Sequence, residues 1–284
     1  MRAGDLGPAA LDQRHFNLVS AFWTADYKWT DQITFLAGYG FAQRPPTLVE
    51  LYGDGPFLAL LQNGTNFVVG GNPALYPEQL NQIDIGAKAN FDTVRAGANG
   101  YYAFVHDYIT FQELPKVING VGQTVPSFTG YRFINTPQAR LSGFESYVEY
   151  DMTDWLTPFG TLAYANGRDL YSHQALPSIF PLDSRAGFRL HDTAKRPKWT
   201  VEFSARMVAG QQNAATSLNQ VTSEGFTVFD IRSYWQVRDN LLLTAGIENL
   251  FNRNYQEPFD LRDGVNGGVY QPGFNFYVGF RWTY

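Results

Sequence analysis

The sequence contains no cysteine, few charged residues and no long hydrophobic run. The absence of cysteine excludes disulfides, thiolate metal sites and cysteine nucleophiles. Charged residues make up 17% of the 284 residues, whereas an ordinary soluble domain has about 25%. No apolar run approaches the roughly 18 residues that a membrane-spanning helix needs, which excludes a helical membrane protein. The net charge of −5 is unlike the basic surface of a nucleic-acid-binding protein, so we expect no nucleic-acid partner.

Aromatic residues and glycine are abundant instead. The 23 Phe, 17 Tyr and 6 Trp make up 16% of the chain, and 27 Gly and 15 Pro are scattered through it. Many aromatics with few charges indicate a large buried or lipid-facing surface and exclude disorder. Gly and Pro without a regular period fit many strands joined by turns. Residues 1–5 have no apolar segment, so we expect no signal peptide in this sequence.

Apolar and polar residues alternate in many segments, with the period of a β-strand. The clearest alternation covers residues 273–284, 82–91 and 199–207, where one face is uncharged and the other is polar. Weaker alternation occurs in residues 16–27, 33–42, 94–112, 139–150, 155–165, 182–191, 226–237 and 241–249. The sequence therefore predicts about eleven strands.

The connections between these segments alternate between short and long. Short turns are expected near 28–32, 92–93, 151–154, 192–198 and 238–240, and long segments near 43–79, 113–132, 166–181, 210–225 and 252–272. This pattern predicts an up-and-down antiparallel sheet with its long loops at one end, as in transmembrane β-barrels. A soluble β-sandwich would also show alternation. The strand lengths and the aromatics near strand ends favour the barrel, and no composition break divides the chain.

Four segments resemble the C-terminal half of the barrel of TonB-dependent outer-membrane receptors. They are RPPTLVELY at 44–52, GNPALYPE at 71–78, ENLFNRNY at 248–255, and the last strand. The aromatic end of that strand is similar to the signal read by the outer-membrane barrel-assembly machinery, and comprises Phe280, Trp282 and Tyr284. The resemblance covers residues 14 to 284.

The resemblance implies an all-β transmembrane barrel in which about eleven strands form half of 22. Residues 1–284 would be its C-terminal portion, without the plug domain that contacts TonB and without the N-terminal half of the barrel. The implied function is uptake of a scarce nutrient complex across the bacterial outer membrane, with a ferric siderophore as the commonest substrate class. A passive porin-like channel, made by self-association or with a partner chain, and a soluble β-rich binding protein remain alternatives.

Enzymatic motifs are absent from the sequence. It has no Gly-rich phosphate loop, no Gly-x-Ser-x-Gly and no His-Glu-x-x-His. The adjacent pair His106 and Asp107 would point to opposite faces of a strand, so we expect no catalytic residue there. We expect no enzyme activity, no cofactor and no metal site.

Charged residues on the polar faces of the strands are expected to point into the barrel lumen or toward a plug. A lipid-facing Lys or Arg near the membrane centre would cost about 2–4 kcal/mol, which explains their restriction to this face. The alternative role of each is pairing with a neighbouring strand. The candidates are Asp84, Lys88, Arg95, Glu145, Glu149, Asp183, Arg185, Arg189, Glu202, Arg206, Asp230, Arg232, Glu248 and Arg281.

Aromatic and arginine side chains in the long loops are the candidates for ligand binding. Together they suit a planar anionic ligand, such as a ferric catecholate siderophore. The candidates are Arg44, Tyr52, Phe57, Phe67, Tyr76, Tyr131 and Arg132. The alternative is that these aromatics pack the loops together, and that Arg44 and Glu50 have an architectural role. Without Cys or a Met–His cluster, direct binding of copper is not supported.

Overall fold

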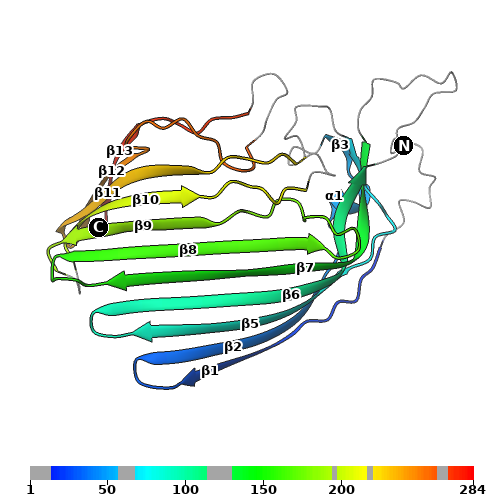
Figure 1. Ribbon diagram of the computed structural model, residues 1–284, viewed down its shortest axis with the longest axis horizontal. Coiled ribbons are helices and arrows are strands. Elements are labelled where there is room, and N and C mark those ends of the chain that lie inside the picture. The colour runs from blue at the N-terminus through cyan, green and yellow to red at the C-terminus, as the bar shows by residue number, and fades with distance from the viewer. Residues whose placement is uncertain (1–13, 57–67, 114–129, 194–196, 216–219, 261–267) are drawn as a thin grey trace.

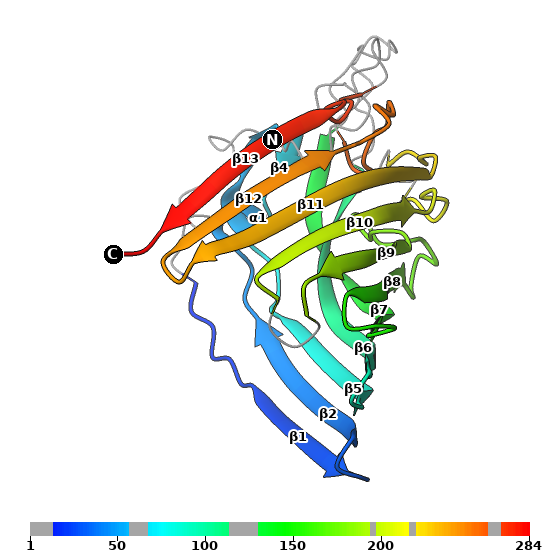
Figure 2. The same ribbon diagram turned by 90° about the vertical axis from the view of Figure 1, so that its left-hand side faces the viewer.

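The computed structural model describes residues 14–56, 68–113, 130–193, 197–215, 220–260 and 268–284. Eleven strands pair in sequence order, each antiparallel to the next, and two further short strands, β3 and β4, lie off this path. The sheet curves into an open arc in which β1 and β13 are the two ends (Figures 1 and 2). The predicted all-β, up-and-down architecture is confirmed.

The strands of the arc are β1 (Ala21–Lys28), β2 (Ile33–Arg44), β5 (Glu78–Asn90), β6 (Val94–Glu113), β7 (Gly130–Tyr150), β8 (Leu156–Asp169), β9 (Asp183–His191), β10 (Trp199–Val208), β11 (Phe226–Arg238), β12 (Leu241–Glu248) and β13 (Asn275–Trp282). The first long connection contains α1 (Leu48–Tyr52), β3 (Asp54–Pro56) and β4 (Val68–Gly70). The long connections gather at one end of the arc and the short turns at the other (Figure 1).

The largest difference from the predicted strands is β7, which begins at Gly130 instead of near residue 139. Its added part pairs with β6 up to Glu113 and, in parallel, with β4. Asp107 has a positive φ of 53° and its position is skipped in the ladder. Val105 and Tyr108 pack in one hydrophobic cluster, although an uninterrupted strand would place them on opposite faces. The corresponding position of β7, between Thr136 and Gln138, is Pro137, and a proline within a run argues against a strand, so the sequence gives no strand signal there.

The helix α1 closes the loop end of the β6–β7 hairpin. Its N-cap Thr47 forms a capping box with Glu50, in which each side chain accepts a hydrogen bond from the other residue's backbone N–H. Leu51 of the helix is buried against the hairpin and against Leu75, which lies later in the same long connection. The cluster it joins contains Leu51, Leu75, Ile109, Tyr131 and Phe133.

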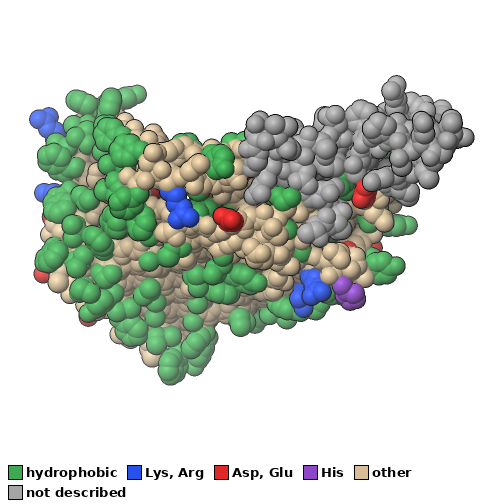
Figure 3. All heavy atoms as spheres, turned by 45° about the horizontal axis from the view of Figure 1, so that its top comes forward, with side chains coloured by type: hydrophobic (Ala, Val, Ile, Leu, Met, Phe, Trp, Pro, Cys, Tyr) green, Lys and Arg blue, Asp and Glu red, His purple; other side chains and the backbone are tan. Residues whose placement is uncertain are grey.

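One face of the sheet is apolar and exposed. On β13 the side chains of Phe276, Val278 and Phe280 alternate along this face, and Phe280 is 75% exposed. Figure 3 shows hydrophobic side chains gathered over the strands, with few charged side chains among them. A soluble sandwich would bury such a face, so its exposure favours contact with lipid. None of the described helices is long and apolar enough to cross a membrane.

Exposed tryptophans mark the end of the sheet that carries the short turns. Five of the six Trp lie in or beside these turns, at the ends of five different strands or connections: Trp29, Trp155, Trp199, Trp235 and Trp282. Indole rings favour the boundary between hydrocarbon and headgroups. The apolar face therefore has an aromatic belt at this end.

Candidate functional site

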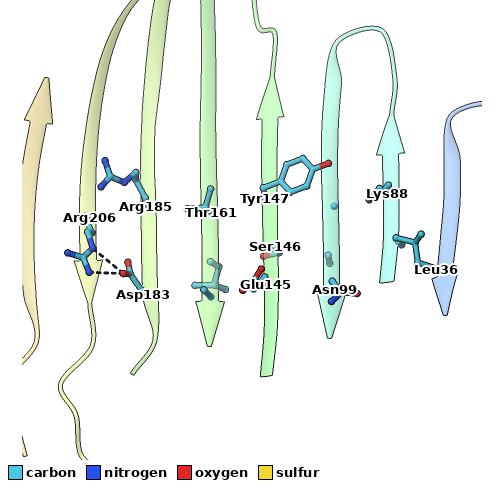
Figure 4. A pocket seen from close by; sticks show the side chains of 15 residues that line it. Leu36, Lys88, Asn99, Glu145, Ser146, Tyr147, Thr161, Asp183, Arg185 and Arg206 are labelled. Carbon is cyan, nitrogen blue, oxygen red and sulfur yellow. Dashed lines mark hydrogen bonds and ion pairs between the residues drawn. The ribbon is translucent and has the colours of Figure 1, made fainter. Parts of the chain in front are cut away.

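The polar face lines the inside of the arc and forms a wide hollow. The hollow has a volume of about 660 Å³ and takes its lining from strands β2 to β10. Figure 4 shows Lys88, Asn99, Glu145, Arg185 and Arg206 around it, carried by five of these strands. These residues alternate with the apolar residues of the outer face, as the sequence predicts.

A continuous chain of ion pairs crosses the inner wall near the short turns. Arg95 of β6 binds Asp151 (2.6 Å) and Glu149 of β7 (3.1 Å). Arg189 of β9 then binds Glu149 (2.5 Å) and Glu202 of β10 (2.9 Å). Four strands are thus linked by bonds between their side chains as well as by their backbones. Charge-assisted bonds of this kind hold a wall better than isolated surface pairs.

A buried histidine borders this chain. The Thr157 hydroxyl donates to Asp151 (2.7 Å) and lies 2.9 Å from Nε2 of His191, which is 4% exposed. The Thr157 hydroxyl donates its single hydrogen to Asp151, so it can only accept from His191. Nε2 of His191 therefore carries a hydrogen and donates it to Thr157. His191 therefore extends the network toward the turn after β9.

A second set of ion pairs lies nearer the long loops. It comprises Arg206–Asp183 (2.9 Å), Arg206–Glu257 (2.6 Å), Asp230–Arg232 (3.3 Å) and Asp230–Arg185 (3.5 Å). Arg206 joins strands β9 and β10 to the loop after β12 through the carboxylate of Glu257. The wall and the loops are therefore coupled by this residue.

Some of the predicted lumen residues have no charged partner in the described part of the chain. Asp84 accepts hydrogen bonds from Gln82. Lys88 and Glu145 line the hollow and form no ion pair within the described ranges (Figure 4). Glu248 and Arg281 lie on the polar faces of β12 and β13 and also form no ion pair there. Lys88 and Glu145 are therefore available to whatever fills the hollow.

Arg44 at the end of β2 is held in place by two carboxylates. It binds Glu78 at 2.6 Å and Glu50 of α1 at 3.0 Å. Burial by itself would raise the pKa of the Glu50 carboxyl, but the hydrogen bonds from Arg44 and Thr47 outweigh it and hold the pKa below its usual range. This arrangement matches the architectural role considered for the 44–52 segment.

The other predicted loop residues fall into three groups. Tyr131 is 1% exposed in the α1 cluster, and Tyr52 packs against the same cluster. Tyr76 is 65% exposed, and Arg132 is exposed and donates to Asn72 (3.3 Å). The last group, Phe57 and Phe67, lies outside the described residues. The ring of Tyr131 is thus enclosed by the loops.

A second hollow at the loop end contains residues that sequence reasoning missed as ligand candidates. It has a volume of about 590 Å³ and lies between the connection after β10 and the one after β12. Arg253, Tyr255 and Tyr270 contribute a guanidinium and two aromatic rings. Burial raises the pKa of the Tyr255 hydroxyl, which stays protonated and able to donate. The available signal was the 248–255 segment, which was recognised only as a family motif.

No group of three or more potential metal-ligating side chains occurs among the residues that the structure describes. Two of the three methionines can be placed: Met152 follows β7 at the short-turn end, and Met207 is on the outer face of β10. Neither thioether lies in the loop-end hollow.

Comparisons with known proteins place this architecture in a family. Residues 12–250 match the family model described as "TonB dependent receptor-like, beta-barrel". The chain is 28% identical over 254 residues to the heme/hemopexin utilization protein C of Haemophilus influenzae (strain 86-028NP), an alignment that covers 84% of this chain and 35% of that protein. The chain thus spans little more than a third of the curated relatives that it matches.

Solved structures show the same fold. The copper transporter OprC has a TM-score of 0.74 and 28% identity over 94% of this chain and 41% of its own. The ferric enterobactin receptor PfeA of Pseudomonas aeruginosa has a TM-score of 0.69 and 17% identity, covering 93% and 40%. The siderophore receptor PirA of Acinetobacter baumannii has a TM-score of 0.65 and 19% identity, over 93% of this chain and 41% of its own. The chain belongs to the TonB-dependent receptors of the bacterial outer membrane and forms part of their β-barrel.

Proposed function

We propose that the whole protein takes up a scarce nutrient complex across the outer membrane, and that residues 1–284 are the C-terminal portion of its barrel. Family membership supports uptake, and the names of the relatives concern heme, copper and siderophores. A plug domain elsewhere in the protein would fill the hollow and connect it to TonB. Lys88 and Glu145, which have no ion-pair partner within the described ranges, would contact that plug.

The ligand we propose is an anionic iron chelate, most simply a ferric siderophore. The observation that carries this is the loop-end hollow, where Arg253 lies with Tyr255 and Tyr270. A guanidinium binds carboxylate or catecholate oxygens through charge-assisted bonds, and aromatic rings stack on a planar ligand. The exposed Tyr76 and Arg132 are the further candidates that the sequence provides at the loop end. The described residues that line this hollow include no thioether to bind copper.

The proposal can be tested by binding measurements on the protein purified from the outer membrane. Isothermal titration calorimetry would be carried out with a ferric catecholate, with haem and with Cu(II) as separate probes. We expect the ferric catecholate to bind, and Arg253→Gln to weaken binding by at least about tenfold, since one charge-assisted bond contributes about 1.5–3 kcal/mol. Arg238→Gln, at the short-turn end of β11, is the matched control. Preferential binding of Cu(II), unaffected by Arg253→Gln, would contradict the proposed ligand class.

The mode of transport needs a separate measurement. Uptake of the bound chelate should require TonB, and the purified protein should conduct no steady ion current across a planar bilayer. Steady conductance without TonB would instead support a passive channel.

The aromatic residues Phe280, Trp282 and Tyr284 are proposed as the signal for the barrel-assembly machinery, and their replacement should lower the amount of assembled protein without altering ligand affinity.

A further inference from the structure

Two arginines stand side by side on the otherwise uncharged outer face. Arg140 of β7 and Arg168 of β8 are directly opposite each other in the antiparallel register. Their neighbours in sequence, Leu141 and Gly167, face the inside. Leu141 packs in the same hydrophobic cluster as Ile179, and Gly167 lies directly against Ile179. Alternation therefore puts both arginines on the lipid-facing side.

Neither arginine has a counter-charge in the described part of the chain, where neither forms an ion pair. Arg168 donates one hydrogen bond, to the His173 carbonyl (3.2 Å). The Nε of Arg140 is buried without a hydrogen-bond partner. Like charges directly opposite each other repel, and a buried donor without an acceptor is unfavourable. One anion bonded to the accessible nitrogens of both guanidinium groups would offset the repulsion between them.

The pair lies just beyond the headgroup layer when the nearest exposed aromatic rings are taken as the edge of the hydrocarbon. Four residues toward the short turns, Phe144 and Tyr164 form an exposed ring pair 6.0 Å apart on the same face. Four residues correspond to about 13 Å along a strand, or roughly 10 Å along the membrane normal at a tilt of about 40°. The headgroup region beyond the hydrocarbon is roughly 5–7 Å thick, and arginine stems can fold back toward it.

We propose that Arg140 and Arg168 bind the phosphate group of a phosphorylated lipid in the outer leaflet. Two planar guanidinium groups match the tetrahedral oxygens of one phosphate. Ser142 and Asn166, the next opposite pair toward the membrane on the same face, can hydrogen-bond the rest of the headgroup. The site is separate from the ligand hollow and does not depend on the proposed transport function.

The test is native mass spectrometry of the protein purified in mild detergent, with lipids added back. The probes are a phosphorylated outer-leaflet glycolipid, the same glycolipid with its phosphates removed, and inorganic phosphate. We expect retention of one phosphorylated lipid, at least about tenfold weaker retention by Arg140→Gln/Arg168→Gln, and no retention of the dephosphorylated form. Arg238→Gln, at the short-turn end of β11, is the control and should retain the lipid fully.

Further outcomes separate the possible anions. Competition by inorganic phosphate at equal concentration would overturn the assignment to a lipid. Equal retention by the wild type and the double variant would overturn the site. If the double variant fails to assemble, Arg168→Gln alone serves, since this side chain is exposed and its loss leaves the strand pairing intact; unchanged retention by that variant would also overturn the proposal.

Discussion

Single residues at the strand ends join the loops to the barrel wall. Arg44 is the clearest example, because its guanidinium binds a carboxylate from β5 and another from α1. Glu78 also accepts from the backbone N–H of Ile109, and so ties β2, β5 and β6 together. Such a residue contributes through the groups left unpaired when it is removed.

Replacing Glu78 should loosen the loop end. In Glu78→Gln, Arg44 keeps only Glu50 as a charged partner, and we expect about 1–3 kcal/mol of local stability to be lost. The measurement is the rate of limited proteolysis in the loop after β2. Glu248→Gln, a carboxylate without an ion pair in the described ranges, is the control. Equal proteolysis of the two variants would contradict the role of Glu78.

Asp151 should make the stability of the wall sensitive to acid. The hydrogen bond from Arg95 lowers its pKa most, and Thr157 adds to this against the opposing effect of burial. A lowered folded-state pKa means that the stabilisation is complete above the ordinary value of about 4. It is lost as the pH falls through the lowered pKa.

We therefore expect the melting temperature of the wild type to decrease when the pH is lowered below about 4. Asp151→Asn should melt lower at neutral pH and show a smaller fall in acid. Asp26→Asn removes a carboxylate of β1 that lies outside the ion-pair chain, and this variant should melt like the wild type at each pH. Parallel melting curves for wild type and Asp151→Asn across the pH range would refute this reading.

At the scale of elements, the inner wall pairs large rings with glycines. The ring of Tyr277 on β13 covers Gly246 on β12, and the two are opposite in the register. Tyr147 of β7 covers Gly97 of β6 in the same way. These close contacts let aromatic rings lie flat along the wall instead of projecting into the lumen.

A side chain at Gly246 should disrupt the β12–β13 pairing. A Cβ there would lie within van der Waals overlap of the Tyr277 ring, and we expect Gly246→Val to cost about 1–3 kcal/mol. The yield of folded protein, measured by its heat-modifiable mobility on a gel, should fall. Gly40→Val, where a Cβ meets no neighbour, should assemble normally. The double variant Gly246→Val/Tyr277→Ala should recover part of the yield.

The elements were predictable where the alternation is unbroken. The expected strands near 33–42, 199–207 and 226–237 agree closely with β2, β10 and β11. The start of β7 is not predicted, because Pro137 argues against a strand and because Tyr131 and Phe133 are buried in the cluster around α1. The ion pairs were expected as a class, but their partners depend on which strands are neighbours and in which register.

The whole molecule is divided into a lipid-facing side and a polar side, and one substitution on each side tests this division. Val278→Lys places a charge on the exposed apolar face of β13 and should cost about 2–4 kcal/mol. Thr244→Lys, on the inner face of the adjacent β12, should be tolerated. Partition of the two variants between folded outer-membrane protein and degraded material is the measurement. Similar losses for both variants would contradict the assigned faces.

The sequence by itself determined the two faces, the number of long strands and the end that carries the loops. These features follow from alternation and loop length, which are local properties of the chain. Only the tertiary structure decided that Arg44 is clamped by two carboxylates, that Tyr131 is enclosed, and that Arg253 shares a hollow with two tyrosines. Each of these depends on residues far apart in sequence, which come together through strand register and the folding of loops onto the sheet.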